Sequence, residues 1–509
     1  MTAESKIKRR TSGGKRIGRM ALCVLLSAGT AAVLPGSLIP GGLSTVFAAD
    51  AEPAEHTEKV TLRIANWEEY IDEGDWDEEE AIDLDDREGT VILGENSMVE
   101  DFEQWYLDTY GTEVEVEYST FGTNEDLYNQ LTLGNDFDLV CPSEYMFMKL
   151  IAEGRLQPLS ESFFDTGRED NYYIRGVSDY IRNIFDTNTI DGEPWSRYAA
   201  GYMWGTTGIV YNPEVISKEE ASHWAILADP KYKGQVTIKD NVRDSYFAAL
   251  GILNEEELMK PDFINSPDRL ERIAELMNRT DEDTVNKAES ILKEMKENAY
   301  SFESDSGKAD MVTGKVLANY QWSGDAVYTL DQAEIDDYYL AYAVPEECTN
   351  IWFDGWVMLK DGIAGNKQRQ TAAEAFVNFL SRPDIAVRNM YYIGYTSSSA
   401  SEQVFEYFDW CYGVVTDPES EDYYEFDNVY VYDVSYFFGE DSYIYLDMDL
   451  LNVEGAVQTN KYADDEYVAG YPVFEGGTVN KGRQAFGQYP TSDVINRSVV
   501  MLDFGNDLA

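Results

Sequence analysis

The stretch Ile351-Trp352-Phe353-Asp354-Gly355-Trp356 places one carboxylate between two tryptophans in an otherwise apolar run. An ionised carboxylate that is buried without a partner costs several kcal/mol. Asp354 must therefore be solvated, be paired inside the protein, or bind a positively charged ligand that Trp352 could flank through a cation–π contact. A structural interpretation, in which Asp354 caps a turn before Gly355 and the tryptophans pack in a core, also fits this stretch alone.

The composition is that of a large, strongly acidic globular protein. The 509 residues suffice for two or more domains, and the 44% hydrophobic content is too high for a mostly disordered chain. The formal net charge is −56, with 95 acidic and 39 basic residues. We therefore expect cations rather than nucleic acid or anionic lipid as partners, although an acidic surface also simply confers solubility.

The first 49 residues have the pattern of a secretory signal peptide. Seven Lys or Arg before residue 20 precede an uncharged apolar segment from Met20 to Leu34, and small residues lead to Ala49. This predicts an exported protein, in the periplasmic space or on the outer face of the cytoplasmic membrane, with residues 50–59 as a linker. An uncleaved membrane anchor is the alternative, but the apolar run is short for a span.

Few histidines and cysteines are available for catalysis or metal binding. His56 and His223 are the only histidines, which argues against a histidine metal cluster or a Ser-His-Asp triad. Cys141, Cys348 and Cys411 follow the signal segment, and their odd number implies no disulfide framework. We expect a protein without cofactor, metal or catalytic residues.

Strand and helix patterns alternate from Val60 onward. Residues 60–66 alternate apolar and polar side chains, Ser97 and Glu100 form a capping box that opens a helix ending at Gly111, and another strand pattern follows. The acidic segment 72–88 between them is expected to be a solvated loop. This β-α-β-α order predicts a doubly wound α/β lobe, whose ligands lie beyond the carboxyl ends of the strands.

A second lobe is indicated farther along the chain. The glycine-rich stretch Gly201–Gly208 suits a hinge at which the chain crosses over, and strands are expected at residues 235–238 and 315–319. The anchor stretch around Trp352 would then return the chain to the first lobe. The predicted division is residues 60–203 and 354–402 for lobe 1, residues 204–353 and 489–509 for lobe 2, and residues 403–488 for an acidic, Tyr-rich insertion that is folded and β-rich.

Taken in order, these segments resemble the substrate-binding proteins of spermidine/putrescine ABC importers. The resemblance covers residues 60–402 and returns at residues 489–505. The matching motifs are Asn66-Trp67-Glu68-Glu69-Tyr70, the run from Phe137 to Tyr145, Trp204-Gly205-Thr206-Thr207-Gly208, Lys231-Tyr232-Lys233-Gly234, Trp322-Ser323-Gly324, Trp352-Phe353-Asp354, and Arg382-Pro383-Asp384 with Ile393-Gly394-Tyr395. The resemblance implies a periplasmic-binding-protein type II fold, with two doubly wound lobes joined by a hinge and a ligand cleft between them.

The resemblance also implies the site residues. The expected aromatic walls of the cleft are Trp67, Tyr70, Tyr145, Trp322, Trp352 and Tyr395. Asp354 would be the principal ammonium anchor, Glu69 and Asp244 further acids, and Ser143 and Ser304 polar contacts. Two departures leave the choice between putrescine and spermidine open: a carboxylate of spermidine binders falls on Asn241, and Met501 stands where a polar contact is expected.

The function implied is capture of a polyamine, as a monomer and without catalysis, and its delivery to an ABC permease. A polyamine offers only spaced charges and an apolar chain, so acids joined by aromatic surface suit it. The individual residues also have structural interpretations: Trp67 and Tyr70 as core aromatics at strand ends, Ser143 as a helix cap, and Asp244 as a surface acid. Alternative functions are a binder of another small cation or iron complex, or an acidic surface hydrolase, carbohydrate-active or adhesive protein that works through the insertion.

Overall fold

The computed structural model describes residues 59–74, 76, 80–84, 87–335, 338–414, 429–447, 457–458, 473–474 and 484–502. The predicted signal segment, nearly all of the linker and parts of the insertion lie outside these residues. No helix within the described part is long and apolar enough to cross a membrane.

Lobe 1 is built on a parallel sheet. Strand β1 (Val60–Trp67) pairs in parallel with β4 (Val114–Phe121) and with β5 (Leu139–Val140). The helices that connect or cover these strands are α2 (Met98–Tyr110), α3 (Asn124–Thr132), α4 (Glu144–Ala152), α15 (Lys367–Leu380) and α16 (Pro383–Ile393). The capping box of Ser97 with Glu100 opens α2 and left-handed Gly111 ends it, which confirms both predicted ends.

Lobe 2 repeats this arrangement. Strand β10 (Val236–Lys239) pairs in parallel with β11 (Ser301–Glu303) and β12 (Ala318–Trp322). Its helices include α8 (Val242–Leu258), α10 (Arg269–Met277), α11 (Glu282–Asn298), α12 (Gly307–Val312) and α13 (Ser323–Ile335). The strands predicted at residues 235–238 and 315–319 are thus present, the second shifted by three residues.

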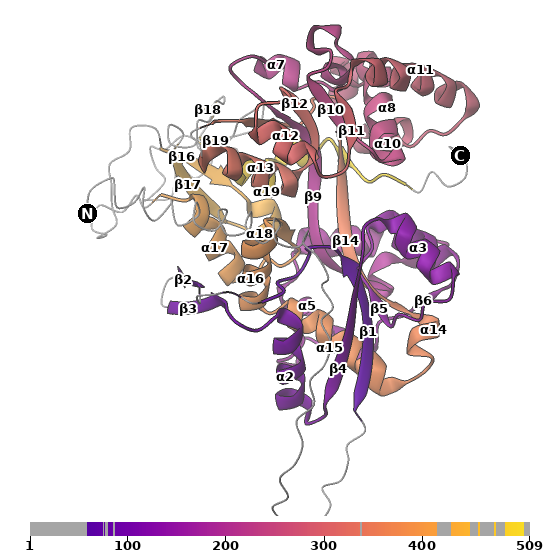
Figure 1. Cartoon of the computed structure of the whole chain (residues 1–509), viewed down its shortest axis with the longest axis vertical. Coiled ribbons are helices and arrows are strands. Elements are labelled where there is room, and N and C mark those ends of the chain that lie inside the picture. The colour runs from indigo at the N-terminus through magenta and orange to yellow at the C-terminus, as the bar shows by residue number, and fades with distance from the viewer. Residues whose placement is uncertain are drawn as a thin grey trace, which may run out of the picture.

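Two long antiparallel strands join the lobes. Strands β9 (Ala199–Tyr211) and β14 (Thr349–Leu359) are buried along their whole length. β14 pairs with β5 of lobe 1, whereas β9 pairs with β12 of lobe 2. One sheet path, β11-β10-β12-β9-β14-β5-β1-β4, therefore runs through the molecule (Figure 1). This topology of two α/β lobes linked by crossing strands confirms the predicted fold class. The lobe limits placed at residues 203/204 and 353/354 fall inside β9 and β14 and stay predictions.

The glycines of residues 201–208 serve close packing within strand β9. A Cβ at Gly205 would approach the Trp352 ring to 2.6 Å and the Ser323 hydroxyl still more closely. At Gly208 a Cβ would collide with the Ala343 carbonyl. The expectation of a crossing segment is met, but by an unbroken strand, because small residues let the neighbouring rings lie directly on the backbone.

The expectation of a solvated loop across residues 72–88 is wrong for the part that the structure describes. Asp72 is buried, and its carboxylate accepts hydrogen bonds from Arg388 Nε at 2.6 Å and Trp76 Nε1 at 3.0 Å. Residues Glu80–Leu84 form β2, which pairs with β3 (Arg87–Leu93). An arginine on α16, distant in the chain, supplies the charge that lets this acid be buried.

The described parts of the insertion are folded and contain a small sheet. Strands β16 (Val429–Asp433), β17 (Tyr443–Asp447), β18 (Val457–Gln458) and β19 (Val473–Phe474) form it in the order β17-β16-β19-β18, beside helices α17 (Glu402–Tyr412) and α18 (Ser435–Phe438) (Figure 1). The Phe437 ring stacks on Trp204 of β9 with centroids 5.3 Å apart. The Ser178 hydroxyl donates to the Phe437 carbonyl at 2.6 Å. These contacts dock the insertion on the side of the lobe junction.

The remaining elements complete the two lobes. They are β6 (Leu156–Gln157), α5 (Tyr172–Gly176), α6 (Asp179–Thr187), β7 (Thr189–Ile190), β8 (Glu193–Pro194), α7 (Lys218–Ala221), α9 (Pro261–Ile264), β13 (Ala341–Ala343), α14 (Lys360–Ile363), β15 (Thr396–Ser397), α19 (Gln484–Gln488), α20 (Ser492–Ile495), β20 (Ser498–Val499), and the 3-10 helices η1 (Glu161–Phe164), η2 (Trp195–Arg197), η3 (Trp224–Ala228) and η4 (Pro230–Tyr232).

Replacing Gly205 by alanine should lower the free energy of unfolding by about 1–3 kcal/mol, because the new methyl group overpacks the contact with Trp352. Urea denaturation of both proteins measures the change. Gly94→Ala is the matched control, since a Cβ at Gly94 meets nothing within 4 Å. Equal stability of the Gly205→Ala variant and the parent would show that this contact is not tight.

Candidate ligand-binding site between the lobes

Asp354 lies in the middle of the crossing strand β14 and is 6% exposed. The Tyr70 hydroxyl donates to its Oδ2 and the Ser143 hydroxyl to its Oδ1, both at 2.8 Å. Ser143 is at the N-cap of α4, yet its hydroxyl makes no capping hydrogen bond and serves Asp354 instead. Desolvation outweighs these two hydrogen bonds and raises the pKa of Asp354 to about 7.

Asp354 and Asp244 differ from most buried carboxylates of the described part of the chain because they lack an ion pair. The buried acids that have a Lys, Arg or His partner are Asp72, Asp138, Glu144, Glu303, Asp325 and Glu347. Glu374 also lacks one, but it accepts hydrogen bonds from the Ser160 amide and hydroxyl. Two predicted site acids are thus buried without an ion pair among the described residues, although the charges of Arg243 and Lys239 still act on Asp244.

Aromatic rings surround Asp354 on the lobe 1 side. The Tyr70 and Tyr395 rings meet edge to face with centroids 5.5 Å apart, and Tyr395 lies 5.6 Å from Trp352. A Cβ at Gly324 would collide with the Tyr395 ring, so this glycine is what lets the ring lie against α13. Four predicted residues, Tyr70, Ser143, Trp352 and Tyr395, are therefore brought together around the predicted anchor.

Asp244 lies in the first turn of α8 and is 3% exposed, so the interpretation as a surface acid is wrong. Desolvation is the largest cause that raises the pKa of Asp244 to about 6, while Arg243, Lys239 and a hydrogen bond from Trp322 oppose it. Asn241, at the start of the same helix, has a structural role. Its side chain accepts from the Arg243 and Asp244 amides and caps α8.

Two basic side chains that the sequence analysis did not foresee occupy the lobe 2 side. Lys239, at the end of β10, is buried, and its ammonium lies 4.0 Å from the Trp322 ring centroid. The ammonium donates to the Ser304 carbonyl at 2.8 Å and lies 3.6 Å from Asp325 and 3.8 Å from Glu303. The Ser304 side chain itself is exposed. Trp322 thus already faces a cation of the protein.

Arg243 forms the second such contact, with Tyr145. Its guanidinium carbon lies 3.3 Å from the Tyr145 ring centroid, and it donates to the Met501 carbonyl at 3.0 Å. It also pairs with Glu144 at 3.5 Å, linking α8 of lobe 2 to α4 of lobe 1. Met501 therefore contributes a polar contact through its backbone, although its side chain is apolar.

Glu69 and Trp67 lie at the carboxyl end of β1 and approach Asp354 less closely than Tyr70 and Ser143 do. Glu69 is exposed with a φ of +54°, and desolvation raises its pKa against the opposing charge of Lys308. The Trp67 ring packs on Phe121 at 4.8 Å, and its buried indole N–H has no hydrogen-bond partner among the described residues. A donor left free in this way is available to a ligand.

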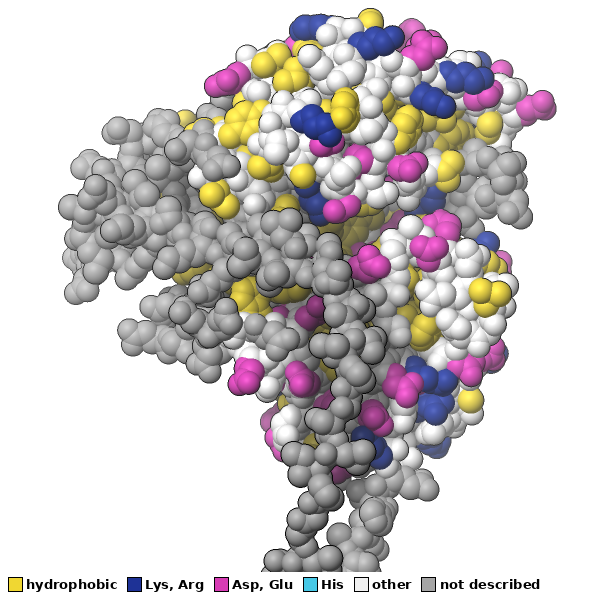
Figure 2. Space-filling view, viewed as in Figure 1, with side chains coloured by type: hydrophobic (Ala, Val, Ile, Leu, Met, Phe, Trp, Pro, Cys, Tyr) yellow, Lys and Arg dark blue, Asp and Glu magenta, His cyan; other side chains and the backbone are white. Residues whose placement is uncertain are grey.

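Asp325 also lies at the candidate site, beside Tyr395, and was not among the predicted residues. It lies in the first turn of α13, where the Tyr395 hydroxyl donates to its Oδ1 at 2.8 Å and Lys308 approaches to 3.5 Å. The signal was present in the sequence, because Asp325 directly follows the motif Trp322-Ser323-Gly324 at a strand-to-helix turn. On the face in Figure 2, acidic side chains gather on both sides of the recess between the lobes.

Without ligand, Asp354→Asn should be more stable than the parent at pH 8, and the difference should vanish toward pH 4. The pKa of Asp354 in the folded state is about 7, above the ordinary value of 3.8, so folded protein loses stability as pH rises through this window. Asparagine removes that loss. Thermal unfolding across pH 4–8 tests this, and a variant that is less stable at pH 8 would contradict a buried, unpaired charge.

Comparisons with known proteins agree with this architecture. The family model of bacterial extracellular solute-binding proteins matches residues 97–404, more than half of the chain. The spermidine/putrescine-binding periplasmic protein of Escherichia coli (strain K12) is 26% identical over 337 residues, which cover 66% of this chain and 76% of that protein. The putrescine-binding periplasmic protein of the same organism is 24% identical over 352 residues, covering 67% and 79%.

A solved structure with a related sequence is that of a spermidine/putrescine ABC transporter substrate-binding protein from Streptococcus pneumoniae. It is 25% identical, and the alignment covers 68% of this chain and 87% of that one with a TM-score of 0.46. Because the family model matches more than half of the chain, the chain belongs to the family of bacterial extracellular solute-binding proteins.

Proposed function

We propose that this chain is an exported binding protein that captures a polyamine, putrescine or spermidine, between its lobes and delivers it to an ABC import permease. The observation that carries the proposal is a pair of buried acids, Asp354 and Asp244, that form no ion pair with a Lys, Arg or His among the described residues. The names of the related periplasmic proteins support the same ligand class.

An ammonium group that reaches Asp354 would complete its environment. Each carboxylate oxygen already accepts one hydroxyl hydrogen bond, which holds the group in one orientation and leaves lone pairs for a ligand N–H. Trp352 and Tyr395 offer ring faces for the cation and for the methylene chain. A charge-assisted hydrogen bond contributes roughly 1.5–3 kcal/mol and a desolvated cation–π contact about 2 kcal/mol. Two such ends, after ordering costs, suffice for micromolar binding.

The two lobes would contribute different parts of the site. Tyr70, Ser143 and Trp352 with Asp354 gather around the crossing strand β14, whereas Asp244 and Trp322 belong to lobe 2. A ligand that touches both groups favours the closed arrangement, because only there does it make all its contacts. We propose accordingly a monomeric binding protein without catalytic activity, which releases its ligand when the lobes part at β9 and β14.

Asp354→Asn should weaken polyamine binding about 10- to 150-fold, since it removes one charge-assisted hydrogen bond. Isothermal titration with putrescine and with spermidine measures the change. Glu374→Gln is a matched control: Glu374 is also buried without an ion pair, but its hydrogen bonds go to Ser160 and Gln370. Absence of binding by the folded parent protein would overturn the proposed ligand.

The parent protein should bind more weakly as the pH falls from 8 to 5.5. Protonated Asp354 and Asp244, with pKa values of about 7 and about 6, must lose their protons when an ammonium group binds. Titrations near pH 6.5 in buffers of different ionisation enthalpy should therefore reveal proton release. The release should be smaller in Asp354→Asn, and an affinity that is independent of pH would contradict the assigned anchor.

Lys239→Met should raise the affinity for spermidine relative to putrescine. The lysine ammonium already lies on Trp322 and between Asp325 and Glu303, which is the environment a further ligand ammonium requires. Removing the charge frees this environment for the longer polyamine. The ratio of the two dissociation constants is the measurement. A ratio that is unchanged in the folded variant would show that Lys239 does not limit the length of the ligand.

A further inference from the structure

A second group of potential ligand atoms lies in lobe 2, outside the residues assigned to the polyamine. His223 stands just before η3, Glu255 lies on α8, and Glu347 lies between β13 and β14. One ligand atom from each residue lies within 4.8 Å of the others. The three positions are 32 and 92 residues apart in the sequence, so only the fold brings them together.

The separations suit coordination of one metal ion. His223 Nδ1 lies 2.9 Å from Glu347 Oε1 and 3.8 Å from Glu255 Oε1. Ligands of a tetrahedral zinc ion with bonds near 2.1 Å are about 3.4 Å apart, between these two values. Imidazole and carboxylate are both donors that zinc accepts, and three protein ligands leave one position for water.

Glu347 supplies an independent indication of a missing positive charge. Its side chain is fully buried, and its Oε2 has no hydrogen-bond partner among the described residues. His223 is its ion-pair partner and engages the other oxygen, so a simple imidazole–carboxylate pair leaves half of the carboxylate unsatisfied. A metal ion that binds Glu347 would provide the compensation that burial requires.

The surrounding backbone holds these residues in place. The Glu346 amide donates to the Ser222 carbonyl, and Trp224 Nε1 donates to the Cys348 carbonyl, both at 2.9 Å. Both neighbours of Glu347 are therefore tied to the neighbours of His223. Such support keeps the ligand atoms together before an ion arrives.

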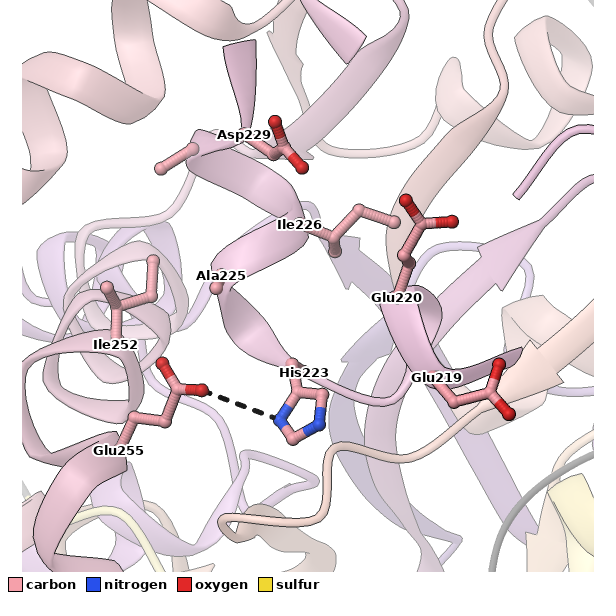
Figure 3. A pocket seen from close by; sticks show the side chains of 9 residues that line it. Glu219, Glu220, His223, Ala225, Ile226, Asp229, Ile252 and Glu255 are labelled. Atoms are coloured by element: carbon pink, nitrogen blue, oxygen red, sulfur yellow. Dashed lines mark ion pairs between the residues drawn. The ribbon is translucent and has the colours of Figure 1, made fainter. Parts of the chain in front are cut away.

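Two of the three residues, His223 and Glu255, line a surface pocket, whereas Glu347 lies buried behind them. Figure 3 shows His223 and Glu255 pointing toward one another in this pocket, which Glu219, Glu220 and Asp229 also line. Lys231 pairs with Glu220, but the pocket retains more acidic than basic groups. The excess of negative charge favours entry of a divalent cation.

We propose that His223, Glu255 and Glu347 form a binding site for a divalent transition metal, with zinc as the ion that best fits the donor set. The ion ties α8 and the segments before η3 and β14 to one another, and it stabilises lobe 2. This site shares no residue with the proposed polyamine site around Asp354 and Asp244. Each of the two proposals can therefore be tested and refuted separately. The expectation of a protein without a metal site rested on the scarcity of histidines. The proposed site needs only one histidine, because two glutamates that are distant in the sequence supply the other ligands.

Titration of the EDTA-treated mature protein with zinc chloride tests the site. We expect binding of one equivalent, a higher melting temperature, and persistence of both in excess magnesium chloride. Glu347→Gln and His223→Gln should each weaken zinc binding at least about tenfold. Glu219→Gln should not, because Glu219 lines the same pocket outside the cluster.

Cobalt(II) provides a readout that surface adsorption does not give. Bound at the site, it should produce visible absorption typical of low coordination number, which Glu255→Gln abolishes even if Glu347→Gln fails to fold. Circular dichroism and a cooperative thermal transition verify that each variant is folded. Absence of zinc binding by the parent, or equal zinc affinity of the parent and the folded ligand variants, would overturn the proposal.

Discussion

The arrangement of the lobe junction depends on one constraint: a carboxylate is buried on the strand that joins the lobes, and no cation among the described residues pairs with it. Asp354 receives two hydroxyl hydrogen bonds, yet desolvation still raises its pKa to about 7. Buried carboxylates elsewhere in the described chain mostly have a basic partner, as Asp72 has in Arg388. The energetic cost at Asp354 makes sense if a ligand supplies the charge.

The crossing strands connect Asp354 to both lobes. β14 pairs with lobe 1 through β5, and β9 pairs with lobe 2 through β12, so Asp354 on β14 lies in the segment that links the two lobes. Gly205 lets Trp352 lie directly on the neighbouring strand, and Gly324 does the same for Tyr395. The aromatic surface next to Asp354 is therefore held by tight backbone packing rather than by flexible side chains.

The two lobes treat charge differently. Around Asp354, lobe 1 presents hydroxyls and rings, whereas lobe 2 presents Lys239 on Trp322 and Arg243 on Tyr145. Lys239 pairs with Glu303 and Asp325, and Arg243 pairs with Glu144. These two internal cations therefore already engage three of the acidic groups in this region. Helix α8 connects this region to the proposed metal site, because it carries Asp244 in its first turn and Glu255 near its end. The two residues are about 16 Å apart along the helix.

Local patterns and the family resemblance were sufficient for the fold class, and they named several of the residues that the structure brings together at the lobe junction. The capping box at Ser97, the alternating residues of β1 and the order of motifs depend on neighbours in the chain, so the sequence alone determined them. The anchor Asp354 was also recognisable, because an acid between tryptophans is conspicuous without any structure.

Tertiary structure alone decided which charges are paired. Arg388 reaches Asp72 across 316 residues, Lys239 takes the face of Trp322, and Glu347 meets His223 from another segment. No local pattern encodes these contacts, because an ion pair depends on distance in space and on burial, neither of which a sequence period specifies. The candidate site residues could thus be named from the sequence, but which buried acids lack an ion pair among the described residues became apparent only from the folded structure.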